Sequence, residues 1–208
     1  MQHRRVSIID YGMGNLRSLA KALERCGASV SVISTPAEVS GADRIVVPGQ
    51  GAFGQAMTRL RDQGIADAVV RAIAGGRPFL GVCLGLQVLF DGSTEAPGVP
   101  GLGIIEGQVT LLPANAETRR PHMGWSPVEH AARDAPAVLS VNPSGEPFYF
   151  VHSFAARTVP PGYTVATAQS GVEFVAALAH ENVVATQFHP EKSQSAGARL
   201  LSAWLEAN

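Results

Sequence analysis

The stretch Phe79-Leu80-Gly81-Val82-Cys83-Leu84-Gly85 runs from a short apolar strand, 79–82, through a cysteine into the start of a helix. It contains G-x-S-x-G with cysteine in place of serine, the pattern of a nucleophile elbow. A bulky residue two positions before or after the nucleophile would collide in so tight a turn, which accounts for Gly81 and Gly85. The helix N-terminus favours the thiolate, and its free N–H groups can stabilise an oxyanion. A buried structural cysteine is the alternative for this pattern alone.

The elbow strand belongs to a series of predicted strands that alternate with helices. The strands are 6–9, 30–33 and 44–47, and the helices are 16–23 (which Gly27 ends), 54–61 and 65–74. Such alternation indicates a parallel sheet covered on both faces.

After about Gly92 the pattern changes to short β-rich segments between turns. These are 109–112, 148–154, 163–168, 174–178 and 183–188, and a helix at 196–205 follows them. We therefore predict one α/β domain over residues 1–208, with a largely parallel central sheet and an antiparallel extension in the second half.

Composition excludes several classes of protein. Of the 208 residues 46% are hydrophobic, and 16 basic against 17 acidic side chains leave a net charge of −1. The chain is long enough for a substantial core, its longest nearly apolar stretch (79–90) is too short to span a membrane, and its charge does not suit a general nucleic-acid binder. Two cysteines form no disulfide framework, and no apolar export segment follows Arg4-Arg5. We expect a cytoplasmic protein with both thiols reduced.

His189-Pro190-Glu191 supplies a candidate base and its partner. Residues two apart on an extended segment face the same way, and Pro190 keeps the segment out of a helix. A carboxylate beside an imidazole can fix its tautomer and support its positive charge. A solvated loop pair is the usual alternative. A deaminase-type zinc site would also need Pro-Cys-x-x-Cys, which the chain lacks, so we expect no metal.

Two glycine-containing loops follow predicted strands. Pro48-Gly49-Gln50-Gly51 lies before the elbow strand and is a natural source of a second oxyanion N–H, although an ordinary strand-to-helix turn explains it equally well. Gly12-Met13-Gly14 begins a dinucleotide fingerprint, but Arg17 stands at its third glycine position. We expect no nucleotide cofactor.

Together, the elbow and the His-Pro-Glu segment resemble class I (triad) glutamine amidotransferase domains. Within this class the chain is similar to the glutaminase subunits of imidazole glycerol phosphate synthase, which serve histidine biosynthesis. The matching segments span nearly the whole chain in the family's order: D-Y-G-M-G-N (10–15), P-G-Q-G-A-F (48–53), G-V-C-L-G-L-Q (81–87), P-H-M-G-W (121–125), Y-F-V-H-S-F (149–154) and Q-F-H-P-E-K-S (187–193). The elbow and H-P-E are common to the class, whereas D-Y-G-M-G-N, H-M-G-W and Y-F-V-H-S point to this subunit family.

The resemblance implies a mixed sheet flanked by helices, and hydrolysis of glutamine to glutamate and ammonia without metal or organic cofactor. Cys83 would attack the side-chain amide of glutamine. His189 would protonate the leaving ammonia and then activate water against the thioester. Glu191 would orient His189.

The resemblance also implies a set of binding residues. The oxyanion would be held by the N–H of Leu84 and by one from the strand Gly49–Gly51. Gln87, with backbone from Ser153 and Phe154, would contact the amino-acid end of glutamine. Two departures from the family stand out: Gln50, which lies in the expected oxyanion strand, replaces a small aliphatic residue, and Ser126 replaces asparagine.

The chain carries no second catalytic motif and is not expected to consume its own ammonia. Ammonia protonates in neutral water and loses its nucleophilicity, so an acceptor subunit should dock and receive it through a protected passage. The resemblance implies a (β/α)₈-barrel cyclase, forming a heterodimer. Our interface candidates are Asn15, Met123, Trp125, Tyr149 and Lys192, with burial in the core as the alternative for Trp125 and Tyr149.

Two other functions are compatible with parts of this pattern. A glutaminase subunit of another pathway, such as pyridoxal phosphate synthesis, would share the triad but not H-M-G-W and Y-F-V-H-S. A DJ-1-like scaffold or redox-responsive protein would use an elbow cysteine without needing His189-Pro190-Glu191. An electrophilic glutamine analogue should label Cys83 stoichiometrically in an amidotransferase and poorly in a redox sensor.

Overall fold

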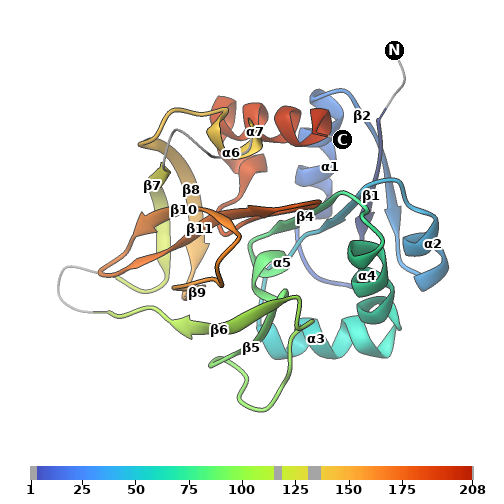
Figure 1. Cartoon of the computed structure of the whole chain (residues 1–208), viewed down its shortest axis with the longest axis horizontal. Coiled ribbons are helices and arrows are strands. Elements are labelled where there is room, and N and C mark those ends of the chain that lie inside the picture. Colours follow the sequence, from blue (N-terminus) through green and yellow to red (C-terminus); the bar gives the residue numbers. More distant parts are fainter. Residues whose placement is uncertain (1–3, 115–118, 131–136, 208) are drawn as a thin grey trace.

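A nine-stranded sheet forms the centre of the computed structural model, which describes residues 4–114, 119–130 and 137–207 (Figure 1). The strand order is β2-β1-β3-β4-β12-β11-β10-β7-β8. The strands are β1 (Arg4–Ile9), β2 (Ala28–Ile33), β3 (Ile45–Val47), β4 (Phe79–Val82), β7 (His122–His130), β8 (Glu146–His152), β10 (Thr164–Gln169), β11 (Glu173–His180) and β12 (Val183–Thr186). The run from β2 to β12 is parallel and the rest is antiparallel, which confirms the predicted mixed sheet.

A smaller, three-stranded sheet is formed by β5 (Phe90–Ser93), β6 (Ile105–Leu111) and β9 (Phe154–Ala156). It corrects one prediction, because the single strand expected over 148–154 is two strands in two sheets. β8 pairs with β7, whereas Phe154 is paired with Leu111 of β6. The chain changes sheets at Ser153, whose carbonyl accepts a hydrogen bond from the N–H of Leu112 at 2.9 Å.

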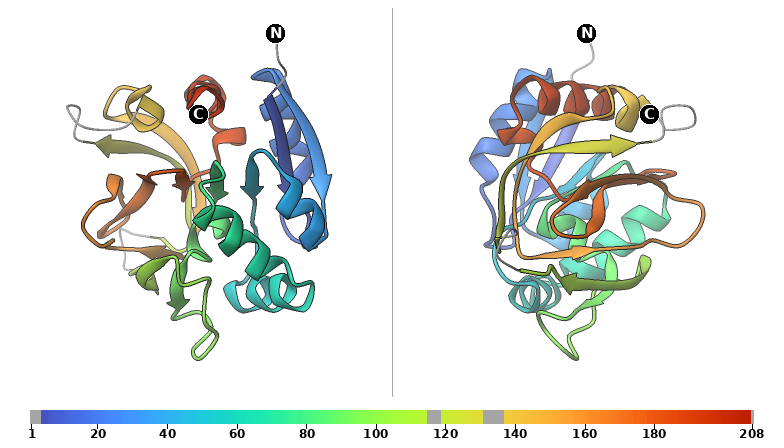
Figure 2. Two further views of the ribbon diagram at one scale, coloured as in Figure 1. Left: turned by 45° about the vertical axis from the view of Figure 1, so that its right-hand side comes forward. Right: turned by 90° about the vertical axis from the view of Figure 1, so that its left-hand side faces the viewer.

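Helices cover both faces of the large sheet (Figure 2). They are α1 (Leu16–Arg25), α2 (Pro36–Gly41), α3 (Phe53–Asp62), α4 (Ile65–Ala74), α5 (Leu84–Gln87), α6 (Ala137–Ser140), α7 (Gln194–Glu206) and the 3₁₀ turn η1 (Pro190–Lys192). Because side chains alternate along a strand, β3 sends Val46 into the core under α1 and α7, and Ile45 and Val47 into the core under α2, α3 and α4. No helix within the described ranges combines the length and apolar character needed to cross a membrane.

The elements α2, α6, β5 and β7 were not predicted, and neither was the turn η1. For α2 the sequence holds a usable signal, since Thr35 and Glu38 form a capping box and Pro36 occupies the first turn. Burial alternates along β7, but its large apolar side chains Met123 and Trp125 lie at exposed positions, so hydrophobicity does not mark its buried face.

The sheet order brings the ends of four strands together. β1, β3, β4 and β12 are parallel neighbours, so their carboxyl ends meet at one edge of the sheet. In open α/β sheets this edge is where ligands bind. The segments that leave it carry Tyr11, the loop 48–51, Cys83 and His189.

Candidate active site

Cys83 occupies a strained turn between β4 and α5. Its φ of 55° and ψ of −106° lie outside the usual regions for a residue with a side chain. The backbone N–H of Cys83 donates to the carbonyl of Thr186 at 2.7 Å, which ties the turn to β12. A Cβ at Gly81 would lie 2.6 Å from the Gly85 carbonyl oxygen, and one at Gly85 would overlap the Val47 carbonyl. The predicted need for both glycines is confirmed.

His189 and Glu191 form a buried pair beyond the end of β12. The imidazole Nδ1 lies 2.8 Å from Glu191 Oε1, and the two side chains are 3% and 4% exposed. The His189 N–H donates to the carbonyl of Tyr149 at 2.9 Å, and the Ser193 hydroxyl donates to the His189 carbonyl at 2.7 Å. These two bonds fix the backbone of His189 at both its N–H and its carbonyl, and so fix the position of the imidazole.

The expectation of an extended segment holds at His189 but is wrong for the residues after it. Pro190–Lys192 form the 3₁₀ turn η1, with Pro190 at its first position. A proline there has a suitable φ and lacks only an N–H that would have no helical partner. Glu191 thus reaches Nδ1 from a helical turn.

Opposing influences act on the pKa of His189. Burial lowers it, but the interactions of the imidazole with Cys83 and with Glu191 raise it to about 9. The buried Nε2 has no hydrogen-bond partner among the described residues. Because Nδ1 is held by the carboxylate, Nε2 is the nitrogen left to exchange a proton with the thiol.

A cavity of about 280 Å³ opens above Cys83. Its lining includes five predicted oxyanion and substrate residues, Gly51, Leu84, Gln87, Ser153 and Phe154, together with Gln50, Glu95, Val151 and His152. The sixth predicted residue, Gly49, packs against Leu84 behind this wall. The cavity therefore brings together segments from β3, the elbow and the β8–β9 turn.

Besides His152, the polar residues Gln187 and Glu95 of the site were not predicted. Gln187 donates from Nε2 to Cys83 Sγ at 3.6 Å and accepts from Gln87 Nε2 at 3.0 Å. Glu95 is the one acidic side chain of the cavity lining, and its Oε2 accepts from the Phe53 N–H at 2.8 Å. Gln187 lies two residues before His189 in a matched segment, but no local pattern singles out Glu95.

Four of the five interface candidates gather on one outer face, which we term the aromatic patch: Met123, Trp125, Tyr149 and Lys192. Met123 is 66% and Trp125 47% exposed, so Trp125 is not a core residue. The Trp125 and Tyr149 rings meet edge-on at 6.0 Å, and Lys192 Nζ lies 5.8 Å from the Tyr149 ring centre. The fifth candidate, Asn15, caps α1 by accepting from the Ser18 N–H.

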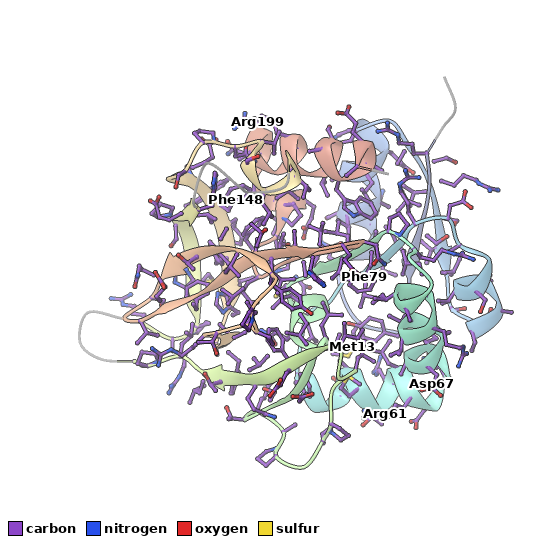
Figure 3. All side chains as sticks on the ribbon, in the orientation of Figure 1. Met13, Arg61, Asp67, Phe79, Phe148 and Arg199 are labelled. Carbon is purple, nitrogen blue, oxygen red and sulfur yellow. The ribbon has the colours of Figure 1, made fainter. Side chains whose placement is uncertain are left out.

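The loop Gly12-Met13-Gly14 packs on the loop 48–51 that follows β3, which we term the oxyanion strand. Met13, which is labelled in Figure 3, belongs to the same core cluster as Phe53 of α3. A Cβ at Gly51 would lie 2.7 Å from Met13 Cε, and Gly51 has a φ of +105°. Only glycine fits there. The parts of the chain that the structure describes contain no group of three or more His, Cys, Asp or Glu placed to hold a metal ion.

Comparison with known proteins agrees with this geometry. The family model for class-I glutamine amidotransferases matches residues 7–206. The chain is 44% identical to imidazole glycerol phosphate synthase subunit HisH of Rhodopirellula baltica over 97% of both chains, and 45% identical to that of Nostoc punctiforme over 95% of this chain and 93% of the other. A solved glutamine amidotransferase shares the fold, with a TM-score of 0.75 and 24% identity over 97% of each chain.

A nucleophile elbow, a buried His–Glu pair and whole-length likeness to these proteins lead to one assignment. The chain belongs to the class-I glutamine amidotransferase family and, within it, to the HisH subunits of imidazole glycerol phosphate synthase.

Proposed function

We propose that the chain hydrolyses glutamine to glutamate and ammonia with Cys83, His189 and Glu191, and passes the ammonia to a cyclase subunit. The observation that carries this proposal is the placement of the elbow thiol and the buried His189–Glu191 pair on adjacent strand ends of the sheet. We further propose that residues 1–208 act as a single domain. A catalytic thiol must stay reduced, which favours the cytoplasm as its location.

The reaction proceeds in two displacements. Cys83 Sγ attacks the amide carbon of glutamine, and its proton passes through His189 Nε2 to the nitrogen that leaves as ammonia when the C–N bond breaks. Water then gives a proton to His189 and attacks the thioester carbon. The C–S bond breaks, glutamate leaves, and the proton returns to sulfur. Glu191 holds the imidazole and supports its positive charge throughout.

Two backbone N–H groups stabilise the oxyanion in this proposal. Leu84 is the first residue of α5, so its N–H has no acceptor within the helix. The second comes from Gly49–Gly51, the strand end beside the elbow. Preorganised donors of this kind supply a large share of catalysis in acyl transfer.

The polar groups around the cavity match the two ends of glutamine. Gln87 and the Ser153–Phe154 backbone face the amino-acid end, where they can hydrogen-bond its carboxylate and ammonium groups. The Glu95 carboxylate provides the negative charge that an α-ammonium group requires. The side-chain amide then extends toward Cys83.

The partner follows from the chemistry of ammonia and from the relatives. The HisH proteins are named as subunits of imidazole glycerol phosphate synthase. We propose that this chain joins the cyclase subunit of that synthase as a heterodimer through the aromatic patch. The patch is linked to the site, because the Tyr149 carbonyl accepts the His189 N–H.

The variant Cys83→Ala tests the division of labour. It should abolish glutamine-dependent synthesis of imidazole glycerol phosphate by the complex and leave synthesis from added ammonia nearly intact. Cys83 acts only in making ammonia, whereas cyclisation belongs to the partner. Comparable loss of both activities would contradict the proposal.

A further inference from the structure

Tyr11 is a buried tyrosine that the proposed chemistry does not use. It lies two residues beyond the end of β1 and has no exposed surface. Its hydroxyl donates to the carbonyl of Pro48 at 2.7 Å, across a sequence separation of 37 residues. A fully buried hydroxyl with a short hydrogen bond to one backbone carbonyl constrains the peptide that bears it.

The Tyr11 hydroxyl lies where the oxyanion strand meets the elbow. A Cβ at Gly49 would stand 2.9 Å from the hydroxyl oxygen, 3.1 Å from the Gly85 N–H nitrogen, and against Leu84. Burial and the charge of Cys83 raise the pKa of Tyr11. The hydroxyl therefore stays protonated and remains a donor.

The hydrogen bond has a geometric consequence for the oxyanion strand. The Pro48 carbonyl and the Gly49 N–H belong to one planar peptide, so holding the carbonyl fixes the direction of both groups. The two peptides that follow, one on each side of Gln50, then determine the direction of the second oxyanion N–H. Tyr11 thus fixes the first peptide of the oxyanion strand, and the rest of the strand extends from it toward the reacting carbon.

We propose that Tyr11 is a positioning residue for glutamine hydrolysis, which anchors the Pro48–Gly49 peptide and thereby keeps the oxyanion strand aimed at the acyl group on Cys83. This inference rests on the proposed function. Catalytic groups must be held to about 0.5 Å. Loss of a whole oxyanion donor costs roughly 10²–10³ in rate, so loss of its anchor should cost a part of that.

The test is Tyr11→Phe, which removes the hydroxyl and keeps the ring. With saturating cyclase, kcat for glutamine hydrolysis should fall roughly tenfold while KM stays within about twofold, because the hydroxyl lies behind the cavity wall. Affinity for glutamate γ-semialdehyde, an aldehyde that forms an oxyanion-like adduct with Cys83, should fall by a similar factor. Ammonia-dependent synthesis should not change.

A matched control is Tyr163→Phe. Tyr163 is half-buried, and its hydroxyl donates to the Ile104 carbonyl at 3.5 Å, in a part of the chain that does not line the cavity. This variant loses the same atom and should keep wild-type kcat, KM and aldehyde affinity.

Each other outcome overturns the inference in a recognisable way. Unchanged kcat in Tyr11→Phe removes any positioning role, and a raised KM with unchanged kcat assigns Tyr11 to substrate binding instead. Loss of ammonia-dependent synthesis and thermal stability together with kcat makes Tyr11 merely structural. If the wild-type complex itself fails to hydrolyse glutamine, the proposed function falls first, and the role of Tyr11 with it.

Discussion

The backbone of Cys83 is the feature at residue scale on which the proposed chemistry depends. A residue with a side chain in so sparsely populated a region costs about 1–3 kcal/mol, and it persists only where its surroundings demand it. Here the turn has no space for a side chain at Gly81 or Gly85, and the Thr186 carbonyl accepts a hydrogen bond from the Cys83 N–H. The strain presents the sulfur at the N-terminus of α5.

The two partners of Cys83 should differ in importance. Glu191→Gln should slow glutamine hydrolysis less than His189→Ala does, because in the proposed mechanism Glu191 orients and stabilises the imidazolium whereas His189 carries the proton. Steady-state kcat of both variants in the complex measures the difference. Equal or reversed losses, in variants with wild-type thermal unfolding, would remove Glu191 from the supporting role.

His152 should make the fold sensitive to acid. Burial lowers its pKa to about 3, although a hydrogen bond to the Phe154 carbonyl at 2.9 Å acts the other way. Its folded pKa lies below the unfolded value of 6.5, so its stabilising contribution is complete above pH 6.5 and is lost as pH falls toward 3. Between pH 7 and pH 5 this amounts to about 2 kcal/mol.

The variant His152→Asn tests this assignment, since its amide can still donate to the Phe154 carbonyl but does not titrate. Its free energy of unfolding in urea should fall less from pH 7 to pH 5 than that of the wild type. His189 does not disturb the comparison: its raised pKa of about 9 makes stability rise somewhat as pH falls through 6.5, but this contribution is the same in both proteins and cancels. Equal falls in both proteins would exclude His152 as the source.

At the scale of elements, the oxyanion strand 48–51 is the candidate switch. Tyr11 holds its start, and its end is a glycine with positive φ. The glycines on either side of Gln50 allow the peptides between them to reorient at low steric cost. Gln50 lines the cavity, so its side chain is placed to influence which orientation prevails.

This arrangement predicts slow hydrolysis by the isolated chain and a sharp rise with the cyclase and its bound ligand. One missing oxyanion donor costs roughly 10²–10³ in rate, so a peptide reorientation alone can supply the switch. The measurement is the glutaminase rate of the chain alone, with cyclase, and with cyclase plus a nucleotide substrate analogue. A chain that alone runs within about twofold of the full complex would have no such switch.

At the scale of the whole molecule, the sheet has two different ends. β2 forms one end and the β7–β8 pair forms the other, where the aromatic patch lies (Figure 1). The patch combines the exposed Met123 and Trp125 with the partly buried Tyr149, and Met, Trp and Tyr are residue types enriched at protein interfaces. The patch adjoins the segment that holds His189, because the Tyr149 carbonyl accepts the His189 N–H, so a docked partner would sit near the triad.

Trp125→Ala should therefore weaken cyclase binding. A buried interface tryptophan contributes at least about 1–2 kcal/mol, so the Kd should rise roughly tenfold or more. Val32→Ala is the control, because Val32 is 52% exposed and lies on β2 at the opposite end of the sheet. Calorimetric titration with the cyclase measures both variants. Equal Kd values would place the interface elsewhere.

The sequence alone determined the features that consecutive residues encode. The period of apolar positions predicted α4 at 65–74 and β4 at 79–82 with the bounds that the structure shows. The elbow was predicted from turn chemistry, because its pattern lies within the five consecutive residues from Gly81 to Gly85 and does not depend on distant parts of the chain. The catalytic triad came from such local patterns together with family resemblance, and it remains a prediction.

Only the tertiary structure decided which distant segments meet. The order β1-β3-β4-β12 sets Tyr11, Pro48, Cys83 and His189 side by side, and pairing with β6 rather than β7 divides the expected strand at Ser153. The contacts of Tyr11 with Pro48 and of Gln187 with Cys83 join residues 37 and 104 positions apart. Local periodicity cannot predict such contacts, because the order of the strands depends on how the apolar faces of all the elements are buried together.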